Sequence, residues 1–111
     1  MERMERHEIL ETLGGISEEI YLELVRLLIK QTEEQVERAY QALQENRYDV
    51  LAGIAHSIKG SSANLRLVDV FHAALNLEQA AKQQAGIAAI REILRVLTEA
   101  VWNLGGEFPP G

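Results

Sequence analysis

The sequence predicts an all-α fold, an antiparallel up-down-up-down four-helix bundle with a short extra N-terminal helix. Three observations support this prediction. Hydrophobic residues are 47% of the 111 residues, yet only 5% are aromatic and two are prolines, a composition that favours helices over a β-sandwich. Glycine and asparagine mark a few regular breaks. Between the breaks apolar residues recur with helical spacing, and connections this short make successive helices antiparallel neighbours.

The first two helices have clear sequence boundaries. Glu8 to Leu13 forms a short helix that ends at the pair Gly14-Gly15. Ser17 caps the next and longest helix, which carries acidic residues in its first turn and ends around Asn46. The apolar stripe of this helix contains Tyr21, Leu24, Val25, Leu28, Val36, Ala39 and Leu43.

Three further amphipathic helices follow with the same rhythm. The third begins at Asn46 or Asp49 and reaches Leu65, the fourth covers 67–81 and the fifth covers 87–104, with an apolar stripe that begins at Ile87. We expect Phe71 and Trp102 to lie in the core. No repeat divides the chain, so we expect one domain over residues 1–104 and a flexible tail over 105–111.

Charge and composition exclude several classes of function. A formal net charge of −6 is a poor match for a surface that neutralises nucleic-acid phosphates. The chain has no cysteine, so disulfides and thiolate metal sites are excluded. Because the first residues are charged and no long apolar run occurs, we expect a cytoplasmic protein that does not meet a membrane.

The third helix carries one histidine away from its apolar face. With Leu51 at zero on a helical wheel, His56 lies at about 140° and faces solvent or the rim of the bundle. Its neighbours within two turns are small except for one lysine, and they are Ala52, Gly53, Lys59, Gly60 and Ala63. Glycine inside a helix costs about 1 kcal/mol relative to alanine, so we infer that Gly60 and Gly53 give another protein access to the imidazole.

These residues suit the transfer of a phosphoryl group. A neutral imidazole is nucleophilic near neutral pH, and the ammonium of Lys59 at i+3 can meet the incoming phosphoryl oxygens. The sequence has no Gly-rich nucleotide loop, no Walker-type lysine and no carboxylate cluster for Mg²⁺. The phosphoryl group must therefore come from one partner protein and leave to another, and the chain is not expected to be an enzyme.

The stretch from Ala55 to Leu65 resembles the histidine-containing phosphotransfer (HPt) domain family, whose pattern is histidine, any residue, hydrophobic, lysine, glycine, small, small. Leu13-Gly14-Gly15, Asp49 and Leu77-Glu78 also look like family features, so that the resemblance covers most of residues 8–104. Arg66 departs from the family, in which glycine is frequent at this position. This departure concerns the turn after the third helix.

The resemblance implies a role for each site residue. His56 would be the phosphoacceptor, Lys59 the phosphoryl-stabilising cation, Gly60 the residue that gives access, and Glu78 a residue that orients the ring. Ala52, Gly53, Ala63 and Lys82 would lie on the partner-facing surface. The partners would be a sensor or hybrid histidine kinase and response-regulator receiver domains. The chain would need no cofactor, since Mg²⁺ belongs to the receiver. The resemblance leaves the oligomeric state open, and a monomer is the default expectation.

Other interpretations stay open from the sequence alone. The chain could be an interaction module of the same fold that binds receivers without phosphorylation, or a piece of a larger sensor kinase. A carboxylate–metal bundle enzyme is disfavoured because inward Glu-x-x-His pairs are absent. Gly53 could mark close helix packing, and Glu78 with Lys82 could be a simple i, i+4 helix pair. His7 and His72 are interpreted as structural or surface residues.

Overall fold

The computed structural model describes residues 1–109 and contains no strand in that range. Residues 110 and 111, the end of the predicted tail, lie outside the described residues. The helices are α1 (Arg6–Thr12), α2 (Glu18–Gln44), α3 (Tyr48–Asn64), α4 (Val68–Lys82) and α5 (Ile87–Glu107). The predicted all-α fold class is confirmed.

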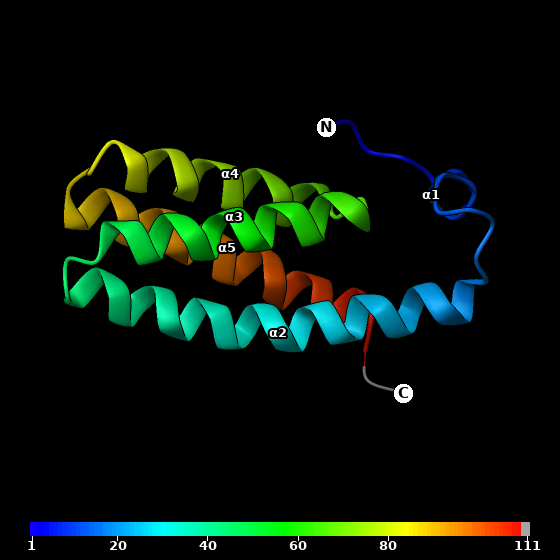
Figure 1. The fold of residues 1–111 in the computed structure, drawn as a ribbon. Helices are drawn as coiled ribbons and strands as arrows, with labels where there is room; N and C mark the ends of the chain where they lie inside the picture. The colour runs from blue at the N-terminus through cyan, green and yellow to red at the C-terminus, as the bar shows by residue number, and fades with distance from the viewer. Residues whose placement is uncertain (110–111) are drawn as a thin grey trace.

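The four long helices lie side by side, and α1 lies near the N-terminal end of α2 (Figure 1). Helix α2 packs against α3 and α5, and α4 packs against the same two helices. The Tyr21 hydroxyl, near the start of α2, donates to the Leu65 carbonyl at the end of α3 (2.6 Å). Helices α2 and α3 therefore run in opposite directions.

Aliphatic side chains from all five helices form the core. Most members of the predicted stripes are buried, including Val25, Leu51 and Leu94, each 0% exposed. Phe71, which was expected in the core, is only half-buried. Leu24 and Ile87 are further exceptions, with exposed fractions of 40% and 45%. Both of these stand at the margin of the apolar stripe of their helix, where the bundle leaves them uncovered.

The three turns between the long helices share one backbone geometry. Each has a non-glycine residue with positive φ, namely Asn46 (56°), Arg66 (58°) and Gln84 (52°). The next backbone N–H then closes a Schellman motif onto a carbonyl of the preceding helix. These bonds are Arg47 N to Ala42 O (2.8 Å), Leu67 N to Ser62 O (2.9 Å) and Ala85 N to Ala80 O (2.9 Å). Arg66 thus keeps the same turn as its counterparts, and its guanidinium also donates to the Ala63 carbonyl (2.7 Å).

The helix starts agree with the sequence only in part. The Ser17 hydroxyl accepts a hydrogen bond from the Ile20 N–H (3.2 Å), as expected of the cap of α2. Helix α3 begins at Tyr48, and its cap position, Arg47, makes no side-chain bond. The prediction of a start at Asn46 or Asp49 was therefore wrong. The Schellman turn itself sets the direction of the chain there.

Two predictions about α5 were wrong. Trp102 is 81% exposed, so it is not a core residue. The helix continues to Glu107 and Phe108 is buried, so residues 105–108 are not a loose tail. The guanidinium of Arg6 lies over the rings of Tyr21 (5.2 Å) and Phe108 (4.8 Å), which ties the end of α5 to α1 and α2.

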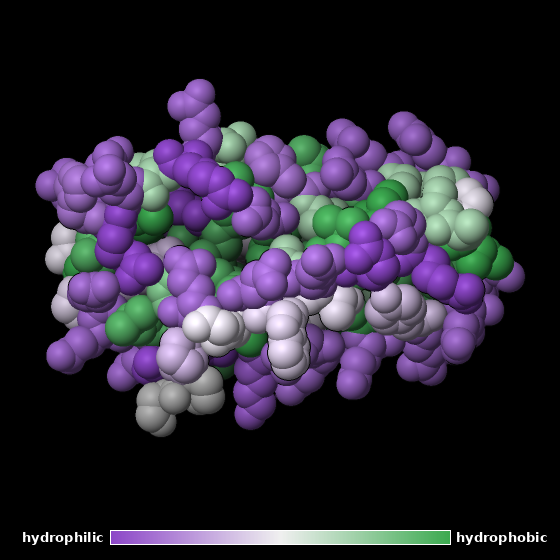
Figure 2. Space-filling model, turned by 180° about the vertical axis from the view of Figure 1, so that it is seen from behind, coloured by the Kyte–Doolittle hydropathy of each residue, from purple (hydrophilic) through white to green (hydrophobic). Residues whose placement is uncertain are grey.

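The face opposite to the viewer of Figure 1 is mostly hydrophilic, with hydrophobic residues showing in small areas (Figure 2). Among the described residues, no helix is both long and apolar enough to span a membrane.

Candidate functional site

His56 stands on the outer side of α3. Its side chain is 71% exposed, whereas its neighbours Ala55 and Ile58 are 0% exposed and face the core. The buried side of the helix is set by apolar residues at helical spacing, and His56 falls off that line. The imidazole is therefore within reach of another protein.

Small residues surround the imidazole on α3. Gly53 and Gly60 are exposed, and a Cβ atom added to either would meet no atom within 4 Å. Close helix packing is therefore not the reason for Gly53. Ala52, one turn before the histidine, and Ala63, two turns after it, are half-buried. The structure thus brings together, around His56, the small residues that the sequence singled out.

Helix α4 contributes a buried carboxylate to the same place. Glu78 has a side chain only 6% exposed, and its Oε2 lies 2.7 Å from His56 Nδ1. Lys59 Nζ donates to Glu78 Oε1 (2.6 Å), and Lys82 Nζ lies 3.8 Å from Oε2. Glu78 is therefore not only the partner of Lys82 in an i, i+4 pair on α4. It also joins the α3 and α4 parts of the site.

Comparison with known families decides what kind of domain this is. The family model described as Hpt domain matches residues 23–105. The chain belongs to the Hpt domain family. Domains of this family take part in histidine phosphotransfer in two-component signalling and interact with receiver domains and histidine kinases. No curated protein and no solved structure matches the chain.

The charges around Glu78 determine which imidazole nitrogen of His56 carries the hydrogen in this Hpt domain. The hydrogen bond from Lys59 holds the pKa of Glu78 below its ordinary value, against the effect of burial, and the bond with His56 acts in the same direction. An ionised carboxylate only accepts hydrogen bonds, so His56 Nδ1 must carry the hydrogen. In the neutral ring Nε2 then has the free lone pair.

The family resemblance placed Glu78 beside His56 as a residue that orients the ring, and the structure has this contact. The hydrogen bond from Lys59 to Glu78 and the burial of Glu78 were not predicted. A signal for its burial does exist, because Glu78 lies four residues after Ala74 and three before Ala81, which are both buried. A second contact that the sequence did not suggest joins α2 to the site helix. Gln35 Nε2 donates to the Ser57 hydroxyl (3.1 Å), beside a surface groove of about 570 Å³ between α2 and α3.

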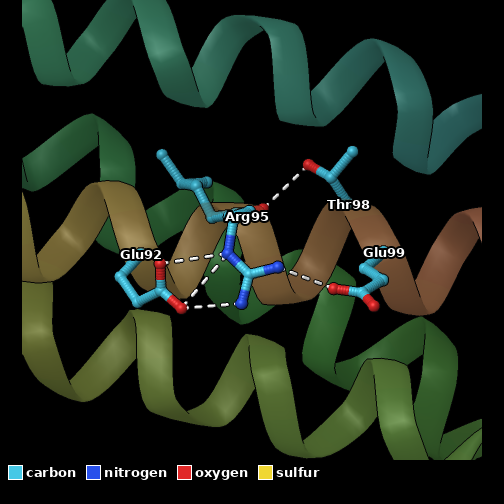
Figure 3. A network of polar contacts seen from close by, with 5 residues as sticks. Glu92, Arg95, Thr98 and Glu99 are labelled. Carbon is cyan, nitrogen blue, oxygen red and sulfur yellow. Dashed lines mark hydrogen bonds and ion pairs between the residues drawn. The ribbon is translucent and has the colours of Figure 1, made fainter.

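Two other charged clusters differ from the one at Glu78. On α5, Arg95 donates to both Glu92 and Glu99 (Figure 3), and these carboxylates raise the pKa of Arg95. All three side chains are more than half exposed, which makes this network a surface feature of the helix. Among the described residues, one exposed group has potential metal ligands in range of one another, at Glu5, His7 and Glu8. This group is in and next to α1, whereas His56 is on α3.

Proposed function

We propose that this Hpt domain is a phosphorelay carrier. It accepts a phosphoryl group on His56 from a kinase or from the aspartate of a receiver domain, and passes it to a response-regulator receiver aspartate. The observation that supports this most strongly is the 2.7 Å contact between His56 Nδ1 and Glu78, which leaves the opposite nitrogen of an exposed ring free.

The proposed step needs no general base from the chain. The Nε2 lone pair forms a bond to phosphorus, while the bond between phosphorus and the aspartyl oxygen breaks and its electron pair leaves with the carboxylate. The Nδ1 hydrogen stays on the ring, which becomes positively charged. Glu78 accepts the hydrogen bond from Nδ1 and thereby stabilises the charge that develops.

The surroundings of His56 fit the approach of a receiver domain. The open space over Gly53 and Gly60 leaves room for the partner at the ring. In this proposal Mg²⁺ and the aspartate belong to the receiver, and the chain brings no cofactor. We further propose that the domain works as a cytoplasmic monomer with its long helices in up-down-up-down order.

Incubation with a phosphorylated receiver domain tests the proposal. The expected result is label on the Hpt domain that is labile in acid and stable in base, as a phosphoramidate bond to histidine is. The variant His56→Gln should fold and acquire no label. Label that persists in His56→Gln would contradict the proposal. Tight receiver binding without any label on the wild type would instead support a receiver-binding interaction module.

A further inference from the structure

The two lysines at the site stand in different surroundings. The side chain of Lys59 is 25% exposed, and its ammonium donates to Glu78 Oε1 at 2.6 Å. The side chain of Lys82 is 67% exposed, and its ammonium stays 3.8 Å from Oε2, beyond hydrogen-bond distance. One lysine is therefore held by the carboxylate and the other is only near it.

Lys59 cannot leave Glu78 without cost. The carboxylate is 6% exposed, so loss of its closest cation would leave a buried charge with weaker compensation. A carboxylate that loses this charge partner also becomes a poorer acceptor for the His56 Nδ1 hydrogen. The contact of Lys59 with Glu78 thus supports the ring, and it must persist while the phosphoryl group arrives.

Lys82 is free to move. An exposed i, i+4 pair is worth little, and Glu78 Oε2 keeps its 2.7 Å bond to His56 when Lys82 turns away. The Glu78 Oε2 atom that is 3.8 Å from Lys82 Nζ is the same atom that is 2.7 Å from His56 Nδ1, so an exposed lysine side chain at this position has the length to extend past the ring. Together Lys59, Lys82 and ionised Glu78 have a net charge of one positive unit. Of the two ammonium groups, that of Lys82 is the one that can move toward an incoming anion.

We propose that the phosphoryl group on His56 is met by the ammonium of Lys82, whereas Lys59 is a positioning residue that acts through Glu78. This inference rests on the proposed carrier function. The bonds made and broken are those given above, and Lys82 adds only a charge–charge contact with the phosphoryl oxygens. The role differs from the one that the sequence suggested, in which Lys59 meets the phosphoryl group and Lys82 only faces the partner.

A small phosphoryl donor tests this without protein docking. Phosphoramidate serves, because its P–N bond breaks as the bond from Nε2 to phosphorus forms, and ammonia leaves. We expect Lys82→Met to be phosphorylated about threefold to tenfold more slowly than wild type, the effect of one exposed charge close to the reacting group. Lys82→Arg should restore most of the rate. Lys30→Met, which removes the remaining lysine of the chain on α2, is the matched control.

The imidazole nitrogen signals separate the two lysines. In ¹⁵N spectra Lys82→Met should keep the Nδ1–H form of His56, whereas Lys59→Met should reduce it. Unchanged phosphorylation of Lys82→Met would overturn the inference, and so would a Lys59→Met variant with an unaltered imidazole spectrum. Wild type that accepts from phosphoramidate but never from a receiver would contradict the carrier function alone. Wild type that accepts from neither would overturn both.

Discussion

Replacing Glu78 by glutamine isolates the charge at the centre of the site. The amide oxygen of Glu78→Gln can still accept the hydrogen bond from His56 Nδ1, but Lys59 loses its counterion. Breaking a fully buried ion pair costs about 3–5 kcal/mol and an exposed pair less than about 1 kcal/mol. Because a quarter of the Lys59 side chain reaches solvent, we expect an intermediate cost. It should be about 2 kcal/mol, or about 10 °C in Tm.

Urea unfolding at several pH values measures this cost. The folded-state pKa of Glu78 lies below its ordinary value of 4.5, so its stabilising effect is complete above pH 4.5 and is lost as the pH falls through the folded-state value. The gap between wild type and Glu78→Gln should therefore be widest near neutral pH and shrink in acid. The matched control is Glu92→Gln, which removes an exposed partner of Arg95 and should change stability too little to resolve. Equal losses in both variants, or a gap that stays constant into acid, would refute the reasoning.

Four other predictions follow from particular residues. Gly60→Ala should stabilise the protein by up to about 1 kcal/mol. Gly60→Gln should keep the fold and slow phosphoryl transfer from a receiver, but not from phosphoramidate. If Gly60→Gln and wild type accept from the receiver at equal rates, Gly60 is not needed for access to His56. Ser17→Ala should lower the free energy of unfolding by about 1 kcal/mol in urea, and no loss would mean that the cap is inactive. Gln84→Gly should raise the free energy of unfolding in the same assay by about 0.5–1 kcal/mol, because glycine adopts positive φ without strain. Arg66→Gly should gain less, because it also loses the hydrogen bond from the Arg66 guanidinium to the Ala63 carbonyl. A larger gain for Arg66→Gly than for Gln84→Gly would contradict the account of the turns. The fluorescence of Trp102 should have a solvent-exposed emission maximum and be quenched by iodide, and protected emission would contradict its exposure.

The helices were predictable from the sequence because their signals are local. Ser17 caps α2 through a bond to a residue three positions away, and the apolar stripe needs only the period of the helix. The start of α3 was not predictable, because it follows from a Schellman turn with Asn46 at positive φ and not from a capping side chain. Trp102 was wrongly assigned to the core because the prediction relied on its large apolar side chain and not on its position on the helical wheel. It lies off the line of Leu97 and Val101, which are buried.

The site, too, has features that follow from one helix alone and features that depend on how two helices pack. The outward position of His56 depends only on which residues of its own helix are buried, so a helical wheel found it. The contact with Glu78 depends on how α3 packs against α4, which a helical wheel for one helix does not contain. The residue pattern therefore showed Glu78 and Lys82 only as neighbours on one helix, and it was the family resemblance that placed Glu78 beside His56. The structure adds the contact of Lys59 with the same carboxylate.

The most direct test of the account is to identify the atom of His56 that carries phosphorus. A long-range ¹H–¹⁵N correlation spectrum of the imidazole, recorded before and after phosphorylation, gives this answer. We predict the Nδ1–H form before the reaction and a bond from Nε2 to phosphorus after it. Phosphorus on Nδ1, the nitrogen held by Glu78, or on a residue other than His56 would contradict it.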